Sequence, residues 1–104
     1  MSNDRIDALR RMAERNPNDP RALFGLAIEH EKRGEWAEAA ASLQRYLELS
    51  DDQGNAWGRL GNALRQLGRT DEARAAYQRG VAEANRHGHP SMAAEFEEIV
   101  DDLD

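Results

Sequence analysis

The sequence contains no cysteine, only one lysine and no long apolar run. The missing cysteine excludes disulfides and thiolate metal sites. No apolar stretch approaches the roughly 20 residues that a membrane-spanning helix needs, and no apolar signal core follows the N-terminal residues. The net charge of −6 disfavours long-range attraction to nucleic acid or to an anionic membrane. We therefore expect a cytoplasmic protein that binds neither nucleic acid nor membrane.

The amino-acid composition suits one small folded domain over residues 1–104. Apolar residues make up 39% of the chain and charged residues 33%, which is too apolar for a disordered tail and too charged for a membrane protein. Comparing the sequence with itself at a shift of 34 residues brings repeat 1 (20–53) into phase with repeat 2 (54–87). The coinciding pairs include Leu26 with Leu60, Gly34 with Gly68 and Ala39 with Ala73.

Each repeat has the apolar spacing of two helices joined by a short turn. In repeat 2 the stripe of a first helix, at i, i+3, i+4 and i+7, consists of Trp57, Leu60, Gly61 and Leu64. The stripe of a second helix consists of Ala73, Tyr77 and Val81. Gly34 and Gly68 fall between the two helices, where a glycine with positive φ commonly ends a helix. We expect the hydroxyl of Thr70 to cap the second helix of repeat 2.

Repeat 2 resembles the tetratricopeptide repeat (TPR) pattern. The residues that carry the resemblance are Trp57, Leu60, Gly61, Leu64, Gly68, Ala73 and Tyr77. The resemblance covers residues 20–87 and implies an all-α, right-handed solenoid of antiparallel helical hairpins. The six expected helices lie at about 3–15, 20–33, 36–49, 54–67, 70–86 and 90–103.

The two terminal helices are expected to close the stack. Residues 3–15 match the second helix of a truncated repeat, and the helix at 90–103 has an apolar face that would cover Tyr77. The other face of this last helix is acidic and consists of Glu95, Glu97, Glu98, Asp101, Asp102 and Asp104. We interpret it as the solvated side of a capping helix, with an acidic interaction tail as the alternative.

Catalytic motifs are missing from the sequence. It has no glycine-rich phosphate loop, no His-Glu-x-x-His and no nucleophile elbow, so we expect neither an enzyme nor a cofactor. We interpret His30 as a packing residue inside the first hairpin. His87 and His89 could contact a metal, but the pair lacks a third ligand, and we expect no metal site.

The resemblance implies that the first helices of successive repeats line a concave groove that binds a protein or peptide. Carried over position by position, it implicates Arg21, Phe24, Ile28 and Lys32 in repeat 1, and Asn55, Arg59, Asn62 and Arg65 in repeat 2. Gly58 is expected to face the same groove. Phe24 and Ile28 form an apolar spot that anchors a peptide or, alternatively, packs under Ile6 or Leu9.

The polar part of this set leaves two interpretations open. Arg59, Asn62 and Arg65 form either a site for carboxylates or an ordinary solvated face paired with nearby acids. The first function hypothesis is a scaffold that binds acidic or C-terminal peptide segments. The alternative is a self-associating structural module, a homodimer through the face that carries Phe24 and Ile28. We accordingly expect a monomer or a weak homodimer.

Overall fold

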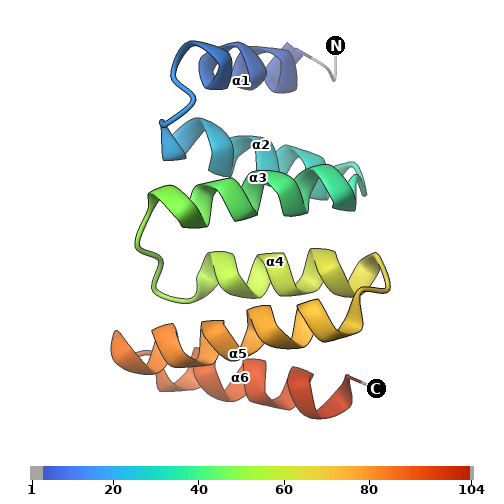
Figure 1. The fold of residues 1–104 in the computed structure, drawn as a ribbon, viewed down its shortest axis with the longest axis vertical. Helices are drawn as coiled ribbons and strands as arrows, with labels where there is room; N and C mark the ends of the chain where they lie inside the picture. Colours follow the sequence, from blue (N-terminus) through green and yellow to red (C-terminus); the bar gives the residue numbers. More distant parts are fainter. Residues whose placement is uncertain (1–3, 104) are drawn as a thin grey trace. The chain divides into compact units, whose positions relative to one another are not determined.

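The computed structural model describes residues 4–103, and within that range the chain is all-helical, with six helices and no strand (Figure 1). The helices are α1 (Asp4–Arg15), α2 (Pro20–Lys32), α3 (Trp36–Leu49), α4 (Asn55–Gln66), α5 (Thr70–Arg86) and α6 (Pro90–Asp102). The all-α prediction is confirmed, and the expected helix ends hold to within one residue. The expected start of the first helix at Asn3 lies outside the described residues. The chain divides into two compact units, unit 1 up to Ser50 and unit 2 from Asp51.

In unit 1, α2 and α3 form a hairpin and α1 packs on α2. Small residues allow the two hairpin helices to approach closely, because Ala27 and Ala39 are both fully buried. Helix α1 contributes Ile6 and Leu9 to a buried cluster with Leu26 of α2.

Gly25 lets α1 lie close to α2. An ideal Cβ built on Gly25 would come within 2.9 Å of Leu9 Cδ2. Helix α1 therefore covers the side of α2 that carries Gly25 and Leu26.

In unit 2, α4 and α5 form the corresponding hairpin, and α6 packs on α5. A Cβ on Gly61 would lie 2.8 Å from the ring of Tyr77, so the missing side chain lets this α5 ring pack against the α4 backbone. The ring of Phe96 lies 5.7 Å from that of Tyr77, centroid to centroid. The expectation that the last helix covers Tyr77 is thereby confirmed.

Gly58 corrects one prediction about the faces of α4. It was expected to face the groove, but it is buried and faces α6. A Cβ on Gly58 would lie 2.4 Å from Phe96 Cζ, and one on Gly80 of α5 would lie 2.9 Å from the same ring. Phe96 thus occupies a space that two glycines leave between α4 and α5.

The turn between the helices of each hairpin is the same in both units. Gly34 and Gly68 have φ values of 71° and 76°, as the sequence predicts. In each turn the next residue donates its backbone N–H to a carbonyl five residues back, as Glu35 does to His30. The expected cap of α5 by Thr70 is wrong, because Thr70 is already the first helical residue and Arg69 precedes the helix.

The first helix of each hairpin begins beside an aspartate. Asp19 Oδ1 accepts a hydrogen bond from the backbone N–H of Arg21, at 3.0 Å. Asp52 Oδ2 accepts hydrogen bonds from the backbone N–H groups of Gly54 and Ala56, both at 2.9 Å. These carboxylates satisfy amides that the first turn of a helix leaves without partners, and they fix where the candidate binding helices begin.

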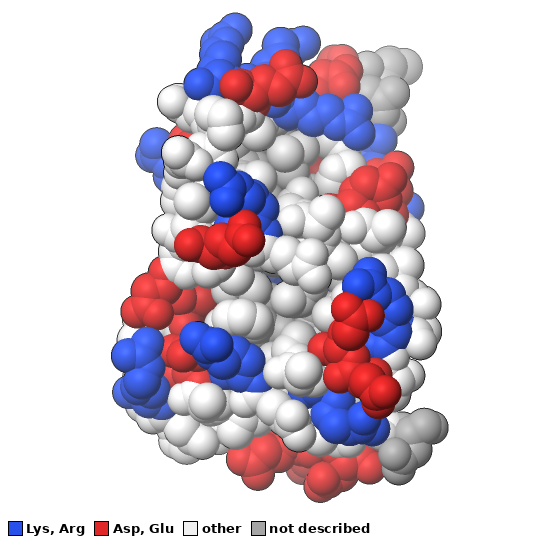
Figure 2. Space-filling view, in the orientation of Figure 1, with Lys and Arg blue, Asp and Glu red and all other residues white. Residues whose placement is uncertain are grey.

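The acidic residues of α6 form one exposed face of unit 2. The described members of this set are Glu95, Glu97, Glu98, Asp101 and Asp102, while Asp104 lies outside the described residues. Figure 2 shows them along its lower edge, where α6 lies. None of the helices within residues 4–103 is long and apolar enough to cross a membrane.

Candidate functional site

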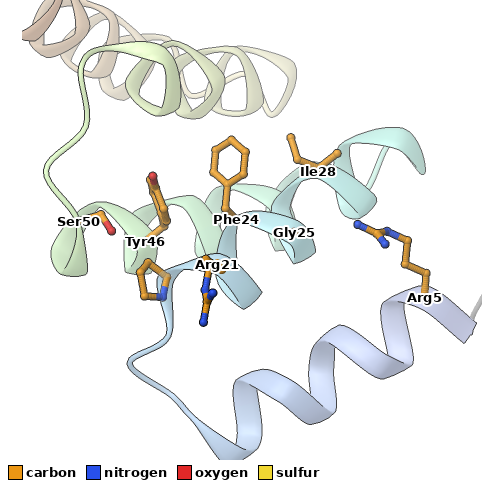
Figure 3. A pocket seen from close by; sticks show the side chains of 8 residues that line it. Arg5, Arg21, Phe24, Gly25, Ile28, Tyr46 and Ser50 are labelled. Atoms are coloured by element: carbon orange, nitrogen blue, oxygen red, sulfur yellow. The ribbon is translucent and has the colours of Figure 1, made fainter.

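A hollow of about 400 Å³ opens on unit 1 (Figure 3). Its lining comes from all three helices of the unit and the residue after α3, and consists of Arg5, Pro20, Arg21, Phe24, Gly25, Ile28, Tyr46 and Ser50. Three of the sequence-predicted residues, Arg21, Phe24 and Ile28, are therefore brought together at one site. The fourth from repeat 1, Lys32, does not line the hollow.

The apolar part of the hollow is built on α2 and α3. The rings of Phe24 and Tyr46 lie 5.1 Å apart, centroid to centroid, with an interplanar angle of 51°, a favourable tilted arrangement. Phe24, Ile28 and Tyr46 are half-buried. Figure 3 shows their side chains on the side of α2 and α3 that faces away from α1.

This placement decides between the two interpretations of Phe24 and Ile28. Helix α1 buries Ile6 and Leu9 against Leu26, and neither Phe24 nor Ile28 belongs to that cluster. The interpretation that the two side chains pack under the N-terminal helix is therefore wrong. They contribute to an apolar hollow instead.

Arg5 and Arg21 also line the hollow, and Figure 3 shows both side chains on the side of α2 that faces α1. The Arg21 side chain is 90% exposed, and its Nε lies 3.4 Å from Asp19 Oδ1. Arg5 Nε donates to Glu29 Oε1 at 2.7 Å, and Lys32 Nζ lies 3.6 Å from the same oxygen. Burial opposes ionisation of Glu29, but Arg5 and Lys32 together outweigh it and lower the pKa of that carboxyl.

In unit 2, the four predicted residues all lie on α4. Asn55, the first residue of the helix, and Arg65 are exposed, while Arg59 and Asn62 are half-buried. Arg65 Nη2 donates to Asn62 Oδ1 at 3.0 Å, so the structure joins two of the predicted residues directly. Within residues 4–103, Arg65 forms no ion pair.

Tyr46 and Arg5 are site residues that the sequence reasoning missed. Arg5 carries no signal in the sequence, because its place depends on how α1 packs. Tyr46 does carry one: at the shift of 34 residues it coincides with Gly80, just as Phe24 coincides with Gly58. An aromatic pair in unit 1 thus stands where unit 2 has the glycine pair that receives Phe96.

The three histidines lie in different surroundings. His30 is buried, as expected for a packing residue, and its Nδ1 lies 2.9 Å from Glu35 Oε1. His89 Nε2 lies 2.7 Å from Gln53 Oε1. His87 is part of a group of three potential metal ligands with Asp51 and Glu83. His87 and His89 therefore have different neighbours, and of these two histidines only His87 lies beside carboxylates.

Comparison with known families and proteins agrees with the repeat pattern. The family model described as "Tetratricopeptide repeat" matches residues 6–54 and residues 24–88 of this chain. TPR repeat-containing protein PA0015 of Pseudomonas aeruginosa is 29% identical over 99 residues, which cover 95% of this chain and 94% of that protein. Small glutamine-rich tetratricopeptide repeat-containing protein 2 of Mycosarcoma maydis is 34% identical over 76 residues, which cover 73% of this chain but 22% of that protein.

A solved structure shows the same fold. A mutant of MamA matches with a TM-score of 0.66 and 21% sequence identity. The match covers 95% of this chain and 66% of that one. At this identity the match supports the helical-repeat architecture alone.

Proposed function

Because the chain belongs to the tetratricopeptide repeat family, we propose that it is a non-catalytic scaffold that binds a segment of another protein. Repeats of this family generally mediate interactions between proteins. The observation that carries the proposal is the apolar hollow of unit 1, which Arg5 and Arg21 also line in a protein of net charge −6.

The hollow suits a peptide with one apolar side chain next to an acidic group. Covering an apolar side chain of this size contributes roughly 1.5–3 kcal/mol, which is enough to anchor a short segment on Phe24, Ile28 and Tyr46. Arg21, which also lines the hollow, has several N–H donors, and its guanidinium is matched to a carboxylate in shape and charge. We therefore propose acidic or C-terminal peptide segments as the ligands.

Unit 2 is proposed to contribute a second contact for carboxylates on α4. Arg59, Asn62 and Arg65 lie on one helix, and the Asn62–Arg65 hydrogen bond holds the Arg65 guanidinium in place. A preorganised guanidinium loses less side-chain entropy when it binds a carboxylate. Asn55, one turn before Arg59, adds an exposed amide to the same helix.

The experiment is capture of partners from a lysate of the source organism, with the tagged protein and three variants. Arg59→Glu/Arg65→Glu should abolish capture, since it replaces two donors by repelling charges. The matched control is Arg10→Glu/Arg11→Glu on the exposed face of α1, which changes the net charge equally and should retain capture. Each variant is first checked for native helix content by circular dichroism.

Phe24→Ala separates the apolar from the charged contribution. It should weaken capture without changing how strongly capture depends on salt, because its contribution is apolar burial. The wild-type complex should weaken as salt rises, since exposed charge contacts are screened. Full capture by both the double-glutamate variant and Phe24→Ala would refute the proposed site.

Self-association is the second candidate function, and the half-buried Phe24 and Ile28 favour it. A homodimer through this face would have a mass that rises with protein concentration, and Phe24→Ala would shift it toward the monomer. Light scattering after gel filtration measures this directly. A monomer mass that does not change with concentration would exclude the homodimer and leave the hollow to a partner.

A further inference from the structure

Three side chains of unit 2 converge between the last turn of α5 and the segment that precedes α4. They are Asp51 from that segment, Glu83 from α5 and His87, which directly follows the helix. One ligand atom from each lies within 4.8 Å of the other two. His87 Nε2 lies 3.8 Å from Glu83 Oε1 and 3.9 Å from Asp51 Oδ2.

Within this group, His87 Nε2 is a buried nitrogen without a hydrogen-bond partner among residues 4–103. A buried polar atom without a partner is costly, and a bound ion is one of the explanations that such atoms have in native proteins. Two carboxylates lie within 4 Å of this nitrogen, so the three groups could share one cation.

Glu83 is the most buried carboxylate of this group and lies beside two arginines. Its side chain is only 10% exposed. The hydrogen bond from Arg86 lowers the pKa of this carboxyl against the opposing effect of burial, and Arg79 lowers it further.

We infer that Asp51, Glu83 and His87 form a binding site for a divalent transition-metal ion of the zinc type. One imidazole nitrogen and two carboxylate oxygens suit Zn²⁺ or Co²⁺, whereas Ca²⁺ and Mg²⁺ prefer oxygen ligands alone. Around zinc, tetrahedral ligand atoms lie about 3.3 Å apart. The two separations from His87 Nε2, 3.8 and 3.9 Å, therefore need to close by about half an ångström, and the separation between Asp51 and Glu83, within 4.8 Å, by up to about 1.5 Å. The exposed Asp51 side chain can make that adjustment. This inference does not rest on the proposed peptide binding.

Arg86 competes with the metal for the same two carboxylates. Its Nη2 lies 2.7 Å from Glu83 Oε1 and 3.2 Å from Asp51 Oδ1. A metal that enters the site must displace at least the contact with Glu83 Oε1. Removal of the guanidinium should therefore strengthen metal binding, an effect that an adventitious surface ion would not show.

The experiment is titration of the full chain with Zn²⁺ by isothermal calorimetry. We expect saturable one-to-one binding that His87→Asn and Asp51→Asn each weaken at least about tenfold, because each removes one of three ligands. His89→Asn is the matched control, two residues from His87 but bonded to Gln53, and should leave the affinity unchanged. Arg86→Gln should tighten binding by about two- to fivefold.

A second measurement uses the wild-type protein alone, so that it does not depend on the folding of any variant. Zn²⁺ should shift the ring signals of His87 in the NMR spectrum and leave those of His89 in place. The inference would be overturned by no binding, by equal loss in the His87→Asn and His89→Asn proteins, or by Ca²⁺ binding as tightly as Zn²⁺. An affinity that Arg86→Gln weakens would also contradict it.

Discussion

Replacing Gly58 by alanine has two opposing effects on the stability of unit 2, a gain in helix propensity and a steric clash with Phe96. Alanine in a helix interior is about 1 kcal/mol more favourable than glycine, so the change would stabilise α4 if its side faced solvent. In this structure the new Cβ would lie 2.4 Å from Phe96 Cζ and 2.6 Å from Cε1. Ordinary contact begins at about 3.4 Å, so the ring would have to move by almost 1 Å.

The ring of Phe96 has little room to move. On its other side a Cβ built on Gly80 would lie 2.9 Å away, and the Tyr77 ring lies 5.7 Å from it, centroid to centroid. Overpacking of this kind typically costs about 1–3 kcal/mol. Set against the gain in helix propensity, Gly58→Ala should destabilise unit 2 by about 1 kcal/mol.

Deleting the ring should reverse the sign of this effect. Phe96→Ala alone should cost roughly 2–3 kcal/mol, at or below the low end for a phenylalanine because Phe96 is only half-buried. In that background the ring atoms that the added methyl group would meet are absent, and the same change should stabilise by about 0.5–1 kcal/mol. The expected coupling between the two changes is therefore about 1–3 kcal/mol.

The assay is urea unfolding of the wild type, both single variants and the double variant, followed by circular dichroism at 222 nm. A change of about 1 kcal/mol corresponds to about 4–8 °C in melting temperature for a domain of this size, so thermal unfolding provides a second estimate. Additive effects, with Gly58→Ala equally favourable or unfavourable in both backgrounds, would show that Phe96 does not occupy the space between Gly58 and Gly80.

Three further predictions concern the same unit. Ending the chain at Gly88 removes α6 and uncovers Tyr77, so the product should aggregate or melt far below the full chain, and a monomer of unchanged melting temperature would refute the docking of α6. Gly61→Leu should destabilise by about 1–3 kcal/mol, because its Cβ would meet the Tyr77 ring; an unchanged urea midpoint would contradict this. Arg86 lowers the pKa of Glu83 in the folded protein. The ionised carboxylate therefore stabilises the fold at pH values above the ordinary pKa of a glutamate, and this contribution is lost as the pH falls through the lowered pKa of the folded state. The difference in unfolding free energy between wild type and Glu83→Gln should therefore be largest near neutral pH and shrink in acid, and a difference independent of pH would rule this out.

The helices could be predicted from the sequence because repetition made the pattern visible twice. Gly34 and Gly68 mark the same turn in both repeats, and a positive φ at each leaves few alternatives to a helix end. The cap at Thr70 was wrong because a hydroxyl before two acids is also compatible with the first turn of a helix, and local sequence does not distinguish the two.

The faces of α4 were harder to predict than its existence. Gly58 lies at the groove position of the repeat, and its burial depends on Phe96, whose place is set by the packing of α6. The same holds for the group of three potential metal ligands in unit 2. It forms because the segment before α4 lies beside the end of α5, which brings Asp51 to Glu83 and His87. Contacts of this kind join residues distant in the sequence, and the pattern of a single sequence does not reveal them.

The central claim is that partners bind on the face of Phe24 and Ile28 and on the Arg65 side of α4. The most direct test places a photoreactive amino acid at Ile28, at Arg65, or at the exposed control positions Ala41 and Ala75, which are equivalent in the two repeats. After irradiation in a lysate, the account predicts that the same partner is crosslinked from positions 28 and 65 and from neither control. Crosslinking from positions 41 and 75 alone would contradict it and would move the binding surface to the second helices of the repeats.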